Sequence, residues 1–386
     1  MTKHRPNFAL LVAIILLVVV GSILISSASI VLSKQATGNP NTYFYMHLGY
    51  LVIGFGLFYA GFKIDYHYWK KIAPFLLLGS LVLMVAVFVP GLGVKINGAR
   101  RWIGGPLQFA PAEVFKLALI VYLATWLDKL GEKVKSFAYS VIPFLIILGI
   151  SATLIILQPD MGTMLIVTAT AGVMYMVAGA NMTYLVGLAM AGVASVIALI
   201  KLEPYRMARF TIFMNPTADQ AGAGYQINQA LLAIGTGGLF GVGFGQSRQK
   251  FNYLPEAATD SIFAITAEEL GFFRAGLIVL AFLVVAYNGY KVAEKAPDKF
   301  GRLLAVGITT WIVFQALLNI AAMLSLVPLT GVPLPFISRG SSSTIMLLFA
   351  SGILINISQF TTGESRESRS NRRRNWWAYL TGLGRN

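Results

Sequence analysis

The chain has 386 residues, of which 56% are hydrophobic and 12% are charged, and its mean hydropathy is +0.71. Soluble domains carry about twice that share of charge, so the composition excludes an ordinary soluble protein. The sequence has no cysteine, which excludes disulfides and thiolate chemistry, and its three histidines (His4, His47 and His67) are too scattered to suggest a metal site. The net charge of +15 would suggest nucleic acid as a partner in a soluble protein, but its placement here favours membrane orientation.

Apolar runs long enough to cross a hydrocarbon core of about 30 Å recur from one end of the chain to the other. The first run is too long for the core of a signal peptide, which indicates an uncleaved anchor. The sequence therefore predicts an all-α polytopic integral membrane protein. We expect about ten transmembrane helices: 8–33, 45–62, 72–89, 112–127, 137–157, one that follows the 158–163 turn and ends at 179, 185–200, one that follows Asp260 and ends near 290, 303–326 and 344–360.

Residues 201–260 form the one long hydrophilic loop, which we expect on the extracytoplasmic side. Within it, 226–245 is apolar enough to be another span, but six glycines crowd its second half, where a lipid-facing helix would be weakened. Ten spans with both termini in the cytoplasm place 18 of the 30 lysines and arginines on the inner face. An additional span would turn 291–302 and the tail outward, against the positive-inside tendency. We therefore predict that 226–245 is re-entrant or lies on the membrane surface.

The chain divides into a transmembrane domain, 1–360, and a basic cytoplasmic tail, 361–386. The tail combines six basic residues with Trp376 and Trp377. Basic residues beside an anionic leaflet contribute about 1 kcal/mol each, and tryptophan favours the interface. We expect the tail to lie on the membrane surface, with a docking site for a cytoplasmic partner as the alternative.

The stretch 249–274 carries four acids (Glu256, Asp260, Glu268 and Glu269), and Asp260 comes directly before an apolar run. A carboxylate there would lie near the boundary between water and lipid, within reach of a lipid-borne substrate. The simpler interpretation is that Asp260 caps the membrane helix, because aspartate is favoured at helix starts. On a helix, Glu268 lies roughly 80° around the axis from Asp260, so these two acids could border one cavity.

Basic residues gather in the loops expected outside, where a phosphorylated headgroup would lie. Arginine binds phosphate bidentately and stays charged, although single arginines at this depth also snorkel to the headgroups. Glu113 and Lys116 share a helix face at the start of a span, and an ionisable pair in a membrane segment usually faces a polar interior. Asp160 follows Pro159 at a helix break, where a capping role would be unremarkable.

Several motifs, in order, resemble those of the SEDS family, the polytopic membrane proteins typified by FtsW, RodA and SpoVE. They are GARRWI (98–103), LQFAPAEVFKLAL (107–119), LQPDMGT (157–163), YRMARFTIFMNP (205–216), GAGYQ (222–226), AIGTGGLFGVGFGQSRQKFNYLPEAATD (233–260), AEELG (267–271) and PLTGVPLPFISRGSSS (328–343). The resemblance implies a peptidoglycan glycosyltransferase with ten spans that polymerises lipid II on the outer side of the plasma membrane. It also implies a class B penicillin-binding protein as partner. The motifs YRMAR and SRQKFNYLPEA favour the division-associated FtsW branch, with other divisome membrane proteins nearby.

The resemblance implies that Asp260 is the essential carboxylate, acting as general base. Substrate-binding candidates are the polar residues of the shared motifs and outer loops: Arg101, Glu113, Lys116, Asp160, Arg206, Arg209, Gln226, Arg248, Glu256, Glu268, Ser338 and Arg339. No protein cofactor is implied, although a divalent cation (Mg²⁺ or Mn²⁺) could assist. The chain departs from the family pattern at Ala258, Ser261 and Arg339, where the family commonly has histidine, an aromatic residue and tyrosine.

Two other functions remain open at this point. A lipid II translocase would need ionisable residues along a path through the membrane midplane, whereas these residues gather toward the outer face. A non-catalytic scaffold for a division complex would suit the apolar surfaces, but it leaves the outer cations unexplained.

Overall fold

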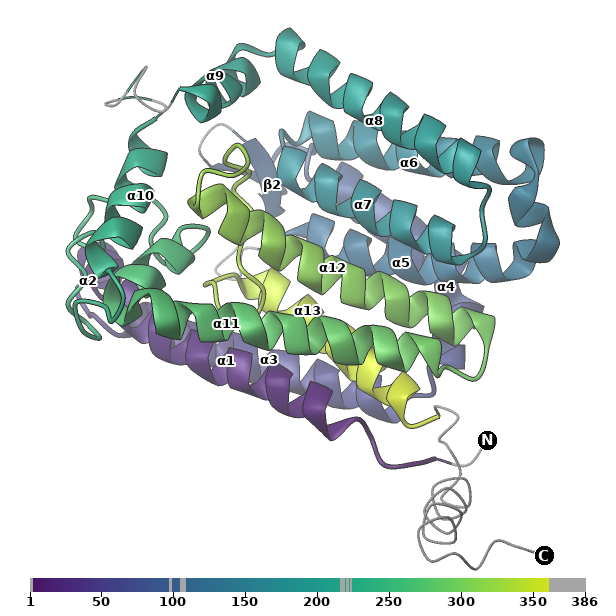
Figure 1. Cartoon of the computed structure of the whole chain (residues 1–386), viewed down its shortest axis with the longest axis horizontal. Helices are drawn as coiled ribbons and strands as arrows, with labels where there is room; N and C mark the ends of the chain where they lie inside the picture. The colour runs from purple at the N-terminus through teal and green to yellow at the C-terminus, as the bar shows by residue number, and fades with distance from the viewer. Residues whose placement is uncertain are drawn as a thin grey trace, which may run out of the picture.

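The computed structural model describes residues 3–96, 99–104, 109–215, 219, 222 and 224–360. Its described part is a bundle of helices running roughly side by side (Figure 1). The ten long helices are α1 (Phe8–Ala28), α3 (Thr42–Lys63), α4 (His67–Ala86), α5 (Pro111–Leu130), α6 (Ile142–Leu157), α7 (Met161–Val177), α8 (Met182–Leu202), α11 (Ile262–Glu294), α12 (Lys299–Met323) and α13 (Ser341–Ser358). The shorter elements are α2 (Ile30–Thr37), β1 (Gly93–Ile96), β2 (Ala99–Ile103), η1 (Gly131–Lys135), η2 (Phe137–Val141), α9 (Pro204–Met214) and α10 (Tyr225–Gly237).

The ten long helices coincide with the ten predicted spans. Eight helical stretches of the described chain are long and apolar enough to cross a membrane, with α6 counted together with η2. Of the other two, α7 is apolar but has 17 residues, and α5 carries four charged residues along its 20. The polytopic α-helical fold is therefore confirmed, and its short antiparallel β1–β2 hairpin is a minor addition.

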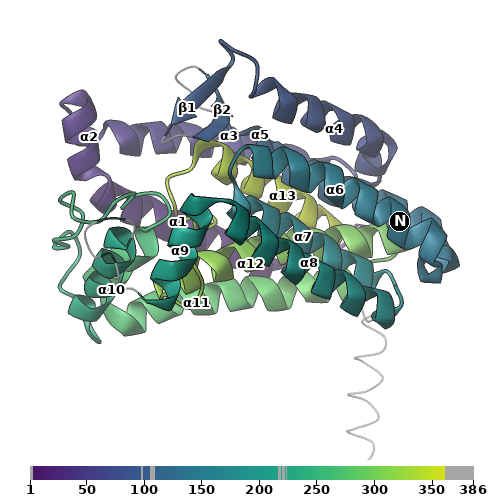
Figure 2. The ribbon, with the colours of Figure 1, turned by 90° about the horizontal axis from the view of Figure 1, so that it is seen from above.

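Burial is uneven across the bundle. Helices α12 and α13 are buried over most of their length, and α12 packs against α5, α7 and α11. By contrast, α8 has no buried residue and lies at the margin beside α7 and α9 (Figures 1 and 2). In lipid, exposed apolar side chains such as Val186, Met190 and Val193 meet a solvent as apolar as they are. The buried centre of the bundle is consequently formed by α5, α12 and α13.

Glycines bring α3 and α13 into close contact. A Cβ atom at Gly352 would lie 2.2 Å from the Phe58 carbonyl oxygen, and one at Gly61 would lie 2.9 Å from that of Phe349. Small residues at such positions allow two membrane helices to approach closely, where packing contacts replace the missing hydrophobic driving force. The two helices therefore pack backbone against backbone along this contact.

The segment 226–245 does not cross the membrane. Its helix α10 has 13 residues, which makes it about 20 Å long, and a glycine-rich loop then returns along the start of α11. The return covers a break in α11 at Gly271, whose φ of 79° lies in the left-handed region. Across the break, Phe272 N–H donates to the Gly238 carbonyl (2.9 Å) and Val242 N–H donates to the Glu268 carbonyl (3.0 Å). The loop therefore supplies the hydrogen bonds that the broken helix lacks.

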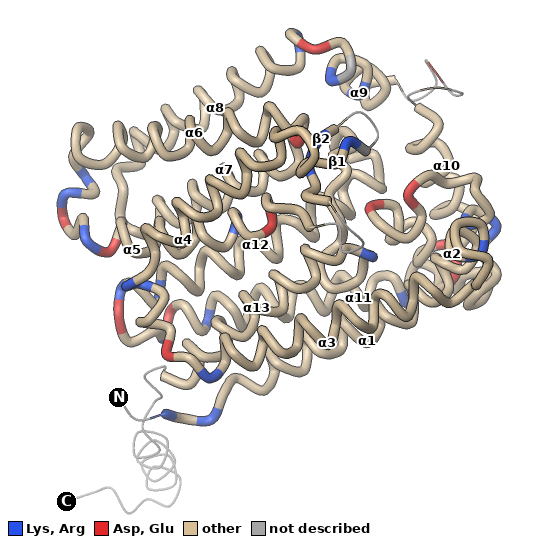
Figure 3. Tube along the Cα trace, turned by 180° about the vertical axis from the view of Figure 1, so that it is seen from behind, with Lys and Arg blue, Asp and Glu red and all other residues tan. Residues whose placement is uncertain are grey.

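Charged residues concentrate toward the two ends of the bundle, with mostly uncharged helix between them (Figure 3). At one end His4 N–H donates to the Gln359 carbonyl (2.7 Å), so both ends of the described chain lie on the same side, as an even number of crossings requires. The opposite end carries α2, α9, α10 and the β1–β2 hairpin, and is called the loop end below (Figures 1 and 2). The predicted tail, 361–386, lies outside the described residues.

Candidate active site

Asp260 lies at the loop end, directly before α11, but it does not cap that helix. The N-cap residue is Ser261, and no side chain makes the capping hydrogen bond. The Asp260 carboxylate instead accepts a hydrogen bond from the Thr259 hydroxyl (3.0 Å), and its side chain is partly exposed. The interpretation of Asp260 as a helix cap is therefore wrong, because α11 starts one residue later and its first turn leaves the carboxylate unused.

Asn319 of α12 fixes the main chain at Asp260. Its side-chain amide donates to the carbonyl oxygens of Asp260 and Val332, at 2.7 Å each. Gly331 lies directly beside the carboxylate, since a Cβ atom there would stand 3.6 Å from Asp260 Oδ2. One buried amide thus joins the segment before α11 to the long loop between α12 and α13.

The loop before α13 makes two further contacts with the same segment. Ser338, a buried side chain, donates from its hydroxyl to the Thr259 carbonyl (2.6 Å). The Arg339 N–H donates to the Ala258 carbonyl (2.8 Å). Main-chain positions on both sides of the carboxylate are therefore held by hydrogen bonds, and this pre-organises Asp260.

The electrostatic surroundings of Asp260 favour its protonated form. Burial raises the pKa of Asp260 to about 6, and the nearby Glu256 carboxylate acts in the same direction. The hydrogen bond from Thr259 and the charge of Arg209 act against that rise. Glu256 Oε2 also accepts from the Thr259 hydroxyl (2.8 Å), and a single hydroxyl proton cannot serve both acids fully. An acid with such a perturbed pKa is typical of functional sites.

Helices α9 and α10 contribute two more of the predicted residues. Arg209 of α9 donates to the Leu329 carbonyl (2.7 Å), and its charge acts on Asp260. Gln226 of α10 donates to the Ser261 hydroxyl (3.0 Å). The structure therefore gathers five predicted substrate-binding residues around Asp260. They are Arg209, Gln226, Glu256, Ser338 and Arg339.

Arg101 and Asp160 belong to a separate structural contact. The Arg101 guanidinium donates to the carbonyls of Gln158 (3.0 Å) and Pro159, which attaches β2 to the turn between α6 and α7. Asp160 caps α7 by accepting from the Thr163 N–H (3.1 Å) and hydroxyl (2.8 Å), so the capping interpretation is confirmed there. These two carbonyls already occupy two of the three guanidinium nitrogens that could have bound phosphate.

Glu268 does not border a common cavity with Asp260, contrary to the sequence-based expectation. Its carboxylate accepts from the Ser247 hydroxyl and from the Arg248 N–H (3.0 Å), so it faces the glycine-rich loop. The neighbouring Glu269 is buried with Lys250, at 3.0 Å between Oε1 and Nζ. The Arg248 side chain is exposed. The helical spacing does not apply to this pair because Asp260 lies outside α11, and the returning loop covers the part of α11 that carries Glu268.

Arg206 and the Glu113–Lys116 pair complete the predicted set. Arg206 makes a long contact of 3.4 Å to the Leu199 carbonyl, near the end of α8. Glu113 and Lys116 form a buried ion pair at 2.8 Å, and Gln315 accepts from Lys116 at 3.0 Å. As the sequence predicted, this pair faces the interior of the bundle.

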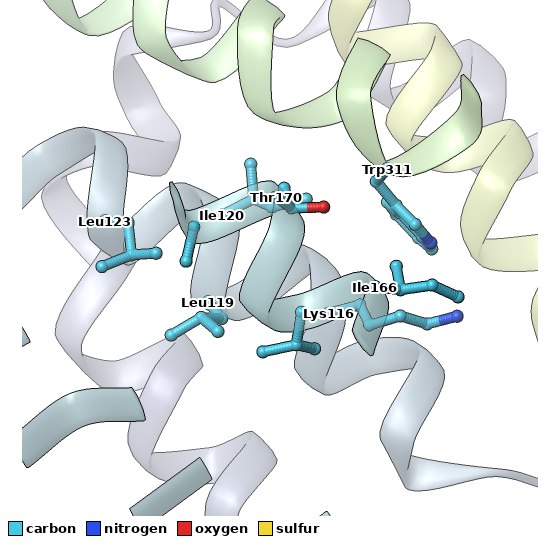
Figure 4. A pocket seen from close by; sticks show the side chains of 9 residues that line it. Lys116, Leu119, Ile120, Leu123, Ile166, Thr170 and Trp311 are labelled. Atoms are coloured by element: carbon cyan, nitrogen blue, oxygen red, sulfur yellow. The ribbon is translucent and has the colours of Figure 1, made fainter. Parts of the chain in front are cut away.

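A hollow beside Lys116 lies between α5, α7 and α12 (Figure 4). Trp311 forms one wall, and the Lys116 ammonium lies 5.1 Å from the centroid of its ring. Apart from Lys116 and Thr170, the lining is apolar and consists of Leu119, Ile120, Leu123, Ile166, Val167, Ala171 and Trp311. This composition suits an apolar group and not a hydrated headgroup.

Sequence reasoning missed Thr259, Asn319 and Gln315. The last two lie in the predicted span 303–326, and polar residues inside an apolar run usually mark a functional or structural contact. The two polar residues could therefore have been singled out from the sequence, but the sequence does not show which residues they contact. Within the described ranges, no three histidine or acidic side chains come together as a metal site. At the candidate active site, the carboxylates of Glu256 and Asp260 both accept from the Thr259 hydroxyl.

Comparisons with known proteins agree with this architecture. A family model for cell cycle proteins of the FtsW, RodA and SpoVE type matches residues 8–363. The stage V sporulation protein E of Bacillus subtilis (strain 168) is 40% identical over 93% of this chain and 98% of its own length. A probable peptidoglycan glycosyltransferase FtsW from Geobacter sp. (strain M18) is 39% identical over 91% of this chain and 96% of its own.

Solved structures match the fold along nearly the whole chain. A chain from a peptidoglycan synthase complex, described as coordinating polymerization and crosslinking, superposes with a TM-score of 0.75. It is 26% identical and covers 92% of this chain and 97% of its own. The rod shape determining protein RodA of Thermus thermophilus superposes with a TM-score of 0.69, at 25% identity over 93% of this chain and 98% of its own.

Proposed function

Because the chain belongs to the family of FtsW, RodA and SpoVE cell cycle proteins, we propose that it is a peptidoglycan glycosyltransferase, as its Geobacter relatives are named. Its substrate is lipid II, which it polymerises into β-1,4-linked glycan strands at the loop end of the bundle. The observation that carries this proposal is the clamped, partly exposed Asp260 carboxylate, whose pKa is raised to about 6 beside Glu256 and Arg209.

Asp260 acts as the general base. It takes the proton of the acceptor sugar 4-hydroxyl while that oxygen forms a bond to the anomeric carbon of the donor. The bond from this carbon to the pyrophosphate oxygen breaks, and undecaprenyl pyrophosphate leaves. Since the donor is α-linked and the product β-linked, one displacement with inversion needs a single base. A pKa near 6 leaves Asp260 ionised at pH 7 and more basic than an ordinary aspartate, and such proton transfer contributes typically 10²–10⁴-fold.

The leaving pyrophosphate needs positive charge where its own charge develops. The sequence offered Arg101, Lys116, Arg206, Arg209 and Arg248 for this role. The surroundings support Arg209, whose charge acts on Asp260, over Lys116, whose charge is already balanced by Glu113 in a buried ion pair.

A divalent cation could bind beside Asp260, with few of its ligands supplied by the protein. Glu256 and Asp260 could each offer a carboxylate oxygen, while pyrophosphate and water would supply the other ligands, as is common for Mg²⁺. Such a cation would neutralise part of the charge of the leaving group. The chain itself contributes Asp260 as the base, Asn319, which holds the main chain at Asp260, and Arg209 as the cation.

We propose a class B penicillin-binding protein as the partner, which accords with the structural match to a chain of a peptidoglycan synthase complex. Similarity to FtsW relatives favours action at the division septum, among other divisome membrane proteins. Both termini face the cytoplasm, since the loop end must meet lipid II outside.

The test is polymerisation of labelled lipid II by the purified full chain in detergent, with and without its cognate transpeptidase. Glycan strands whose synthesis is lost with Asp260→Asn, at unchanged folding, would support the proposal. Absence of strands from a well-folded preparation with its partner would refute it.

A lipid II translocase is the rival function, and the apolar lining of the hollow beside Lys116 weighs against a polar path there. The same protein in vesicles separates the two functions. Transport of labelled lipid II without polymerisation would favour the translocase function and refute the proposal of a glycosyltransferase.

A further inference from the structure

Arg339 is a half-buried cation without an acidic partner. Among the described residues, no carboxylate lies within ion-pair distance of its guanidinium. Its side-chain contact is with Tyr43 of α3, where the guanidinium carbon stands 3.4 Å from the centroid of the ring. Stacking of this kind holds the planar group in place while leaving the N–H donors at its edge available for a bidentate anion.

His47 lies one turn after Tyr43 on α3 and is fully buried, yet neither ring nitrogen has a hydrogen-bond partner within the described chain. Because four residues separate them, His47 and Tyr43 lie on the same face of α3, the face that Arg339 contacts. The helix register agrees, because Gly54, two turns further along, contacts Ile345 and Leu348 of α13. A buried polar group without a partner is costly and calls for a ligand or water.

Two helix N-termini meet beside this pair. Helix α13 begins directly after Arg339, with Gly340 as N-cap and no side chain that caps it. The Ser342 hydroxyl accepts from the Ala110 N–H (2.9 Å), which brings the uncapped start of α5 to the same point. The acid in the first turn of α5, Glu113, is already paired with Lys116. Helix starts carry partial positive charge and bind phosphate groups.

We propose that Arg339, His47 and the start of α13 form a binding site for the pyrophosphate of a polyprenyl-linked substrate. This site rests on the proposed function and adds to it the location of the leaving group. The Arg339 N–H donates a hydrogen bond to the Ala258 carbonyl. Ala258 is two residues before Asp260, and two residues of chain span at most about 7 Å, so a pyrophosphate bound here lies near Asp260. Arg339 is a binding residue, and His47 donates to the phosphate from the buried side.

The test measures binding without turnover, in the full-length Asp260→Asn protein in nanodiscs of neutral lipid, with farnesyl pyrophosphate as probe. Arg339→Gln should weaken binding at least tenfold. Arg339→Lys should weaken binding about threefold or more, because lysine keeps the charge but cannot donate two parallel hydrogen bonds to one phosphate. His47→Phe should also weaken binding, and His47→Gln should restore part of it. The control is Arg100→Gln, which removes an exposed cation from β2 and should change binding less than twofold.

Binding by Arg339→Gln within twofold of its parent would overturn the proposal. If that variant fails to fold, Arg339→Lys and His47→Phe decide, and parent-like binding by both would overturn it equally. Inorganic pyrophosphate that competes as well as the farnesyl form would assign the site to a free anion, and phosphatidylglycerol that competes equally would assign it to bulk lipid; either result would overturn it. Because no polymerisation is measured, a failure here is distinct from a failure of the glycosyltransferase itself.

Discussion

Two pairs of acids lie along α11 and its approach, and the protein treats them oppositely. Glu268 and Glu269 are buried, and each is satisfied: Glu268 by the Ser247 hydroxyl and a main-chain N–H, Glu269 by Lys250 at 3.0 Å. Glu256 and Asp260 are more exposed and share one hydroxyl, and the charge of Glu256 raises the cost of ionising Asp260. The first pair fastens the glycine-rich loop to α11, and the second is left available for chemistry.

The difference shows that burial and charge alone do not identify a functional acid. A fully paired acid contributes to folding, and removing one partner leaves an uncompensated charge. Asp260 is held through its main chain, but its carboxylate shares a single hydroxyl donor with a like charge and is costly to ionise, which is typical of catalytic groups. Four substitutions test this contrast.

The largest effect on folding is expected at Glu269. Glu269→Ala leaves the Lys250 ammonium buried without a counter-charge, which typically costs about 3–5 kcal/mol. We expect a large fall in the Tm of the purified protein, or no folded protein. The double variant Lys250→Met/Glu269→Leu, which removes both charges, should recover much of the loss. A Glu269→Ala protein with the parent Tm would contradict the assignment of this pair to folding.

Asp260→Asn should have the opposite effect on stability. The pKa of Asp260 is raised in the folded state, so the unfolded chain loses this proton first, and the wild type loses stability as pH rises from about 4 through about 6. The neutral amide escapes this cost. We therefore expect a higher Tm than wild type at pH 7.5 and a gap that narrows at pH 5. Equal destabilisation at both pH values would show that the carboxylate is structural.

Glu256→Gln should shift the pH dependence of catalysis. Removing a like charge lowers the pKa of Asp260, so the acid limb of kcat/KM, expected near pH 6 in the wild type, should move to lower pH by a few tenths of a unit to about one unit. Glu132→Gln, which alters an exposed acid in η1 at the other end of the bundle, should leave the limb in place. An unmoved limb in Glu256→Gln would separate the two acids electrostatically.

The smallest effect is expected at Asp160. Since its carboxylate caps α7, Asp160→Ala should cost about 1 kcal/mol of stability, while polymerisation per folded molecule should stay within about twofold of wild type. Asp160→Asn should retain most of the cap. A loss of activity far beyond the loss of folded protein would return Asp160 to the substrate-binding set.

The spans could be predicted because each is a local property of the chain, and the same holds for the glycine-rich segment that α10 begins. Asp160 was also predictable, since a helix cap is decided within a few residues. What could not be predicted depends on contacts between distant segments. The sequence predicted Arg101 as a phosphate ligand, but its Nε donates to the Gln158 carbonyl at 3.0 Å, a contact between segments more than 50 residues apart. Tyr43 and Arg339 lie almost 300 residues apart, and no local pattern connects them.

The account depends most on Asp260 as the base that activates the acceptor sugar. The direct measurement is the initial rate of glycan-strand formation from labelled lipid II by wild type and Asp260→Asn, at equal amounts of folded protein with the cognate transpeptidase. The account predicts a rate at least 10²-fold lower for Asp260→Asn, with lipid II binding retained. A rate within a few-fold of wild type would contradict it.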